Sequence, residues 1–151
     1  MTPNDLHNLA ASIGVRIETA QLPDDRDGEY DHPARTIRIR PGLHARHHRC
    51  VLAHELGHAA FGDIPSLHGP VNAKQERRAE EWAAMRLISL DDYQRAEIIH
   101  GGHAGAMALE LGVMRSTVLA YRAALIRLGG TVYLRPRMGI GQWDQRLQVA
   151  S

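Results

Sequence analysis

Apolar residues recur at two different spacings along this chain, and the two spacings predict different secondary structures. Leu6, Leu9 and Ile13 are three and four positions apart, as on one face of a helix, and Gly14 ends the pattern. Residues 36–40 instead alternate isoleucine with arginine, which is typical of a strand with one buried face. The patterns predict helices at about residues 3–13, 43–61, 73–88, 91–99, 103–111 and 115–128, and strands at 15–19, 29–31, 36–40 and 131–134.

The order of these elements indicates an α+β fold, because strands and helices are grouped along the chain instead of alternating. The strand at 36–40 stops at Pro41-Gly42, and we expect it at an edge of the small sheet. We expect a single domain. Residues 1–90 would form its core, and residues 91–151 would form a helical C-terminal lobe of the same domain.

The composition is that of a globular protein. The chain has 151 residues, of which 44% are hydrophobic, and this length can bury a core without help from disulfides. It has no apolar stretch long enough for a membrane span, and its first residues do not resemble a signal peptide. Cys50 is the only cysteine. We therefore expect a soluble, cytoplasmic protein without a membrane partner. The net charge of +1 argues against direct DNA binding.

Ten of the residues are histidines, and two of these lie in the segment His54-Glu55-Leu56-Gly57-His58. Residues i and i+4 of a helix share one face, so His54 and His58 can bind one Zn²⁺. Glu55 would then lie beside the open coordination position. At the histidine and glutamate frequencies of this chain, chance would produce only about 0.03 copies of the motif. The motif therefore predicts a zinc site on the helix at 43–61.

A catalytic zinc site also needs a third protein ligand. One known solution is a histidine six residues after His58, but Ile64 occupies that position. The other is a carboxylate on the following helix, where Glu76 and Glu80 are four residues apart and share a face. One of them can bind the metal while the other accepts a hydrogen bond from a ligating histidine. Spacing leaves open which does which. Glu81 lies about 100° round the helix from Glu80 and is expected to face water.

Residues 54–58 and 76–84 together form a pair of motifs, HELGH followed by Glu76-x-x-Ala79-Glu80-x-Trp82-Ala83-Ala84. This pair resembles the ImmA/IrrE family of zinc metallopeptidases, and the resemblance covers residues 28–90 well. The family usually has Asn or Asp at the position of Glu80 and Phe at that of Trp82. The resemblance implies a minimal, gluzincin-like zincin domain with a small sheet, a zinc helix, a glutamate helix and a helical C-terminal lobe.

The resemblance also implies the site and the substrate. One Zn²⁺ per chain would be held by His54, His58 and Glu76, with Glu80 as the candidate partner of a ligating histidine. Glu55 would be the general base, which takes a proton from water and returns it to the leaving amine. The implied substrate is a helix-turn-helix transcriptional repressor of a phage or mobile element. In zincin-type folds, an edge strand such as 36–40 can hold the substrate backbone by strand addition.

Spacing does not identify the group that stabilises the oxyanion of the transition state. Four side chains in the C-terminal part of the chain are candidates, since each can donate a hydrogen bond: Tyr93, His100, His103 and Tyr121.

Residues 104–122 have the spacing of a helix-turn-helix, with Gly112 at the turn. In a DNA reader, Arg115 and Arg122 would lie on the recognition helix. The alternative is a pair of packed helices in the C-terminal lobe, which the near-neutral charge favours. The segment raises a second hypothesis, a non-catalytic DNA-binding or regulator-binding module with structural zinc or no zinc. Glu55 distinguishes the two hypotheses, because a structural zinc site needs no base beside the metal.

Overall fold

The fold is described from a computed structural model, in which residues 3–128 are described. The predicted strand at 131–134 lies outside the described residues. The chain divides into two compact units, the first ending at Leu87 and the second beginning at Ile88. The described residues form six helices and a three-stranded mixed sheet, which confirms the predicted α+β class. No helix between residues 3 and 128 is long and apolar enough to cross a membrane.

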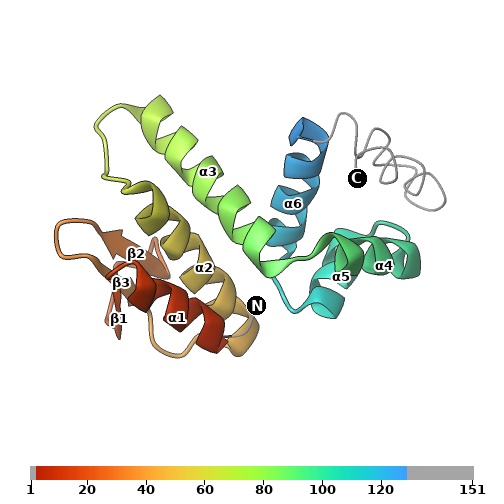
Figure 1. The fold of residues 1–151 in the computed structure, drawn as a ribbon, viewed down its shortest axis with the longest axis horizontal. Coiled ribbons are helices and arrows are strands. Elements are labelled where there is room, and N and C mark those ends of the chain that lie inside the picture. The colour runs from red at the N-terminus through yellow and green to blue at the C-terminus, as the bar shows by residue number, and fades with distance from the viewer. Residues whose placement is uncertain (1–2, 129–151) are drawn as a thin grey trace. The chain divides into compact units, whose positions relative to one another are not determined.

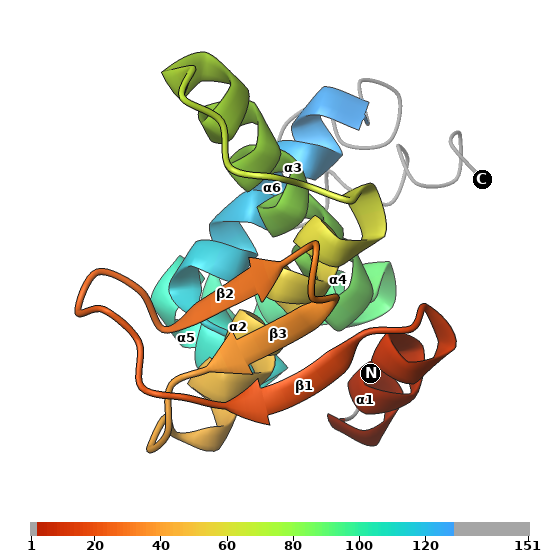
Figure 2. The ribbon, with the colours of Figure 1, turned by 90° about the vertical axis from the view of Figure 1, so that its left-hand side faces the viewer.

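The first unit contains the sheet and three helices. Its strands lie in the order β1-β3-β2, with β1 parallel and β2 antiparallel to β3 (Figure 2). The strand predicted at the sheet edge, β3, is therefore the central strand, and that prediction is wrong. The elements of this unit are α1 (Pro3–Ser12), β1 (Arg16–Thr19), β2 (Gly28–Asp31), β3 (Thr36–Ile39), α2 (Ala45–Phe61) and α3 (Gly69–Leu87).

The central position of β3 explains its alternating sequence. Ile37 and Ile39 are completely or almost completely buried on the inner face of the sheet. Arg38 lies on the outer face, where its guanidinium bonds Glu18 of β1 at 3.1 Å and Glu29 of β2 at 3.2 Å. Charged residues on this strand therefore reflect one solvent-facing surface of the sheet, with ion pairs to both neighbouring strands, and do not mark an edge.

Helix α2 lies between the sheet and α3 in the first unit (Figure 1). Leu52 and Leu56 belong to the buried core of this unit. The two helices come close together at Gly57, where an added Cβ would lie 2.9 Å from the backbone oxygen of Ala79. Any larger residue at position 57 would push the helices apart. Glycine within the HELGH motif therefore lets α3 approach the face of α2 that carries the two histidines.

Helix boundaries differ from the prediction mainly at the start of α3, which begins at Gly69 instead of residue 73. Pro70 lies in its first turn, where the missing N–H costs no hydrogen bond. Helix α2 begins at Ala45, and the Nδ1 of His44 caps it by accepting a hydrogen bond from the amide of His47 at 3.2 Å.

The second unit contains α4 (Leu90–His100), α5 (Ala104–Leu111) and α6 (Arg115–Leu128), and their bounds agree with the predictions to within one residue. Gly112 has a φ of 68° and ends α5, so α5 and α6 form a helix pair with a tight turn. The guanidinium of Arg122 donates hydrogen bonds of 2.9 Å to the Tyr93 hydroxyl and to the Gly102 carbonyl. Arg122 therefore bonds within its own unit, which agrees with the packed helix pair that the near-neutral charge favoured over a DNA reader.

The four side chains considered as oxyanion donors also have roles within the second unit. Tyr93 and Tyr121 are buried, and their rings pack with centroids 4.9 Å apart. His103 caps α5 by accepting from the amide of Ala106, and His100 lies 3.2 Å from a carboxylate oxygen of Glu110.

Candidate metal centre

Helices α2 and α3 bring two imidazoles and one carboxylate into a single cluster. Oε2 of Glu76 lies 2.8 Å from Nε2 of His54 and 3.1 Å from Nε2 of His58. The three candidate ligand atoms all lie within 4.8 Å of one another. His54 and His58 come from adjacent turns of α2, whereas Glu76 comes from α3, so the close contact of the two helices assembles the cluster.

The other nitrogen of each imidazole bonds a second carboxylate. Nδ1 of His54 lies 2.8 Å from Oε2 of Glu80, and Nδ1 of His58 lies 2.9 Å from Oδ2 of Asp63. An ionised carboxylate can only accept, so each Nδ1 donates to its carboxylate, and in the absence of a metal each Nε2 donates to Glu76 when the imidazole is protonated. Sequence reasoning considered Glu80 for this position but missed Asp63. The available signal was an acidic residue directly after Gly62, where α2 ends.

Glu81 is half-buried on α3 and belongs neither to the histidine cluster nor to the cleft described below.

The cluster strongly perturbs the acid–base properties of its members. Burial favours the neutral imidazole, but the bonds from Glu76 and Glu80 outweigh it and raise the pKa of His54 to about 10. Burial also acts to lower the pKa of His58, but the bonds to Glu76 and Asp63 outweigh it, and the pKa of His58 is raised. The same bonds to the two histidines hold the pKa of Glu76 well below its usual range. Without a metal, the site therefore holds a carboxylate anion between two imidazoles of raised pKa, and a divalent cation bound there would displace the Nε2 protons.

The donor set fits zinc in type, with two imidazole nitrogens and a carboxylate oxygen. Zinc ligands at about 2.05 Å in tetrahedral geometry lie about 3.3 Å from one another. The observed separations of 2.8 and 3.1 Å from Glu76 are therefore a few tenths of an ångström shorter than a zinc ion needs. Glu76 is the exposed member of the cluster, so a small rotation of its side chain can lengthen these two separations.

Glu55 lies on α2 between the two histidines in sequence, and its side chain turns toward the sheet. It is only 7% exposed, and a Cβ added at Gly28 on β2 would lie 3.2 Å from its Oε1. Burial raises the pKa of the Glu55 carboxyl, while the charges of His54 and His58 act in the opposite direction. A raised pKa brings a carboxylate closer to the pH at which it works as a general base.

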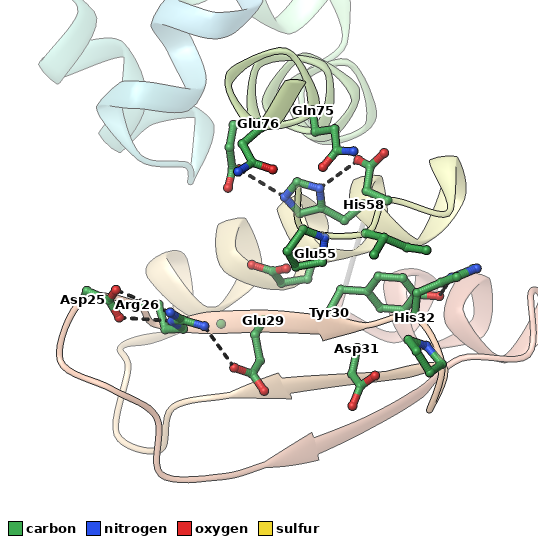
Figure 3. A pocket seen from close by; sticks show the side chains of 16 residues that line it. Asp25, Arg26, Glu29, Tyr30, Asp31, His32, Glu55, His58, Gln75 and Glu76 are labelled. Atoms are coloured by element: carbon green, nitrogen blue, oxygen red, sulfur yellow. Dashed lines mark hydrogen bonds and ion pairs between the residues drawn. The ribbon is translucent and has the colours of Figure 1, made fainter. Parts of the chain in front are cut away.

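A cleft of about 600 Å³ connects the histidine cluster with the sheet. Glu55, His58 and Glu76 line it from the two helices, and residues of β2 line it from the opposite side (Figure 3). Tyr30 and His32 contribute a hydrogen-bonded pair to this wall, with 2.8 Å between the hydroxyl and Nδ1. Neither residue was considered from the sequence, because single polar residues in a short strand carry no motif.

Two helices that present a His/His/Glu group, with a buried glutamate in the same cleft beside a small sheet, define a metallopeptidase-like domain of minimal zincin type. Residues 10–118 match the family model of peptidase M78, described as the IrrE N-terminal-like domain. The match covers well over half of the chain, and the chain belongs to this family, which confirms the resemblance found from the two motifs. A comparison with curated proteins finds no significant match.

Proposed function

We propose that this protein is a zinc-dependent endopeptidase of the cytoplasm, with one Zn²⁺ per chain held by His54, His58 and Glu76. The observation that carries the proposal is the convergence of these three side chains within 4.8 Å, in a cleft that also contains the buried carboxylate of Glu55. A structural zinc site needs no buried carboxylate in addition to its ligands, so Glu55 favours a peptidase over a binding module.

Bound zinc would supply a Lewis acid that polarises the scissile carbonyl. Glu55 would accept a proton from the attacking water and pass it to the leaving amine. Its burial supports this role, because a carboxylate of raised pKa holds a proton long enough to deliver it to the amine. Glu80 and Asp63 would orient the two imidazoles by accepting from their Nδ1 hydrogens.

The sequence predicted that the strand at 36–40, β3, would hold the substrate, but β3 is the central strand. The strand that would hold the substrate is therefore β2, which lies at the sheet edge. The amide of Arg40 donates to the carbonyl of Asp27 at 2.8 Å, so these two residues form a hydrogen-bonded pair. Opposed residues of an antiparallel ladder alternate between bonded and non-bonded pairs. Glu29 is therefore bonded to β3, whereas the N–H and C=O groups of Gly28 and Tyr30 are directed to the outer edge of β2. An extended substrate segment would add to this edge, inside the cleft.

The substrate we propose is a helix-turn-helix transcriptional repressor of a phage or mobile element. Membership of the peptidase family supports a protein substrate, and the free edge of β2 suits an extended segment. In the part of the second unit that the structure describes, Arg122 bonds Tyr93 and Gly102 of its own unit, which favours packed helices over direct DNA reading.

The test is co-expression, and then purified cleavage assays, with repressors encoded next to this gene. Wild-type protein should cleave one of them. Glu55→Gln should retain zinc and the fold but reduce the cleavage rate by about 10²- to 10⁴-fold, because an amide cannot accept the proton. Glu81→Gln makes the same chemical change on α3, outside the cleft, and should cleave at the wild-type rate. Cleavage by Glu55→Gln at the wild-type rate would overturn the proposal.

A further inference from the structure

Helix α2 ends in a way that brings a buried carboxylate back onto His58. Gly62 adopts the left-handed conformation, with a φ of 65°, and the chain reverses there. The amide of the next residue, Asp63, donates to the carbonyl of His58 at 2.9 Å, and its carboxylate accepts from the imidazole of the same residue at 2.9 Å. Asp63 thus bonds His58 twice, once through the backbone and once through the side chain.

A second helix holds this carboxylate in place. The other oxygen of Asp63 is bonded by the guanidinium of Arg78 on α3, and the Asp63 side chain is only 5% exposed. The guanidinium also lies over the ring of Phe61, 4.1 Å from its centroid. Arg78 is therefore held on one side by an aromatic face and bonded on the other by the carboxylate, so that Asp63 has little freedom to rotate.

We propose that Asp63, anchored by Arg78, is a positioning residue that fixes the tautomer and ring orientation of His58 for metal binding. A carboxylate at Nδ1 keeps the hydrogen on that nitrogen and leaves the Nε2 lone pair for the metal. The inference rests on the metal-binding part of the proposed function. Each ligating histidine then has its own carboxylate partner, since Asp63 accepts from Nδ1 of His58 as Glu80 accepts from Nδ1 of His54.

Zinc affinity of the full-length chain, measured by competition with a chromophoric chelator, provides the first test. Asp63→Ala should weaken zinc binding by about 10- to 100-fold, as expected when a carboxylate partner of a ligating histidine is removed. Asp63→Asn keeps an acceptor oxygen of the same shape and should lose less, so this variant keeps the test valid if the alanine variant folds poorly. Arg78→Met should also lose less than Asp63→Ala, because the bond to His58 remains.

A spectroscopic signature separates orientation of the imidazole from general stability. In the zinc-loaded protein, long-range ¹H–¹⁵N spectra should show a protected Nδ1 hydrogen on both His54 and His58. Asp63→Ala should abolish the signal of His58 alone, and the matched variant Glu80→Ala should abolish that of His54 alone. A merely structural role for Asp63 would leave the His58 signal in place or affect both histidines equally.

The outcomes distinguish this inference from the proposed function. If zinc binds with the expected dependence on Asp63 but no repressor is cleaved, the peptidase proposal fails and the positioning role stands. If Asp63→Ala binds zinc as tightly as wild type and keeps the Nδ1 signal of His58, the positioning role is refuted, whether or not cleavage occurs. A chain that binds no zinc at all would also refute it.

Discussion

Replacing Gly28 by alanine tests how closely the substrate-facing strand and the general base are fitted to each other. A Cβ added at this position would lie 2.5 Å from Cγ1 of Val51, and 3.1 and 3.2 Å from Cγ and Oε1 of Glu55. The first separation is far below van der Waals contact, so the backbone of β2 or the side chain of Val51 must move. Val51 is β-branched and lies within α2, so it has few alternative rotamers.

The expected cost follows from that overlap. Forcing one extra carbon into a packed site typically costs about 1–3 kcal/mol, and the free outer edge of β2 favours the lower half of that range. The displaced Glu55 carboxylate should lower the cleavage rate by about 10- to 100-fold, because errors in position approaching 1 Å have effects of that size. Zinc content should stay at the wild-type level, because the three atoms nearest to the added Cβ belong to Val51 and Glu55 and to none of the candidate ligands.

The assay is urea unfolding together with zinc content and cleavage rate. Gly69→Ala is the matched control, since no atom lies within 4 Å of a Cβ added there, and it should behave as wild type. Val51→Ala removes the closest contact, so in the Gly28→Ala background it should restore stability, with a coupling free energy of about 1 kcal/mol. If Gly28→Ala keeps wild-type stability and activity, or if Val51→Ala shows no coupling, the argument for a tight fit is wrong.

Three further predictions concern the cluster and the second unit. Glu76→Ala should abolish zinc binding, whereas Glu80→Ala should weaken it by about 10- to 100-fold. Elemental analysis and competition with a chelator measure both, and the reverse result would make Glu80 the metal ligand and Glu76 the partner of a histidine. Although burial opposes the shift, bonds to Glu76 and Glu80 raise the pKa of His54 to about 10. In protein freed of metal by a chelator, protonated His54 therefore stabilises the fold fully below the ordinary histidine pKa of 6.5, and this stabilisation is lost as the pH rises to 10. Urea unfolding across this window should show a decline that is smaller in His54→Ala, and parallel pH profiles would contradict it. Arg115→Ala should leave repressor cleavage unchanged, and the protein should show no saturable binding to duplex DNA at physiological salt. Salt-sensitive, sequence-specific DNA binding that persists after zinc is removed by a chelator would refute the peptidase interpretation.

Much of this protein follows from local sequence patterns. The spacing of apolar residues predicted five of the helices to within about two residues at each end, because helical periodicity depends only on neighbouring turns. The same local geometry places His54 and His58 on one face of α2, whatever packs against it. The two motifs together indicated the family, which the match over residues 10–118 confirms.

Contacts between elements decided the rest, because they depend on how one element approaches another. Glu76 and Glu80 are equivalent in spacing, and only the packing of α3 at Gly57 places the first at both Nε2 atoms and the second at Nδ1 of His54. The partner of His58 depends on the chain reversal that returns Asp63 to the imidazole.

The position of a strand within a sheet is likewise a property of its neighbours. The alternation of β3 shows that one of its faces is buried, and an edge strand and a central strand can share that pattern. Pairing with both β1 and β2 makes it central and leaves β2 at the cleft. Arg122 is a similar case, because a basic residue on a helix has the same sequence pattern whether it faces solvent or, as here, bonds a tyrosine and a carbonyl of its own unit.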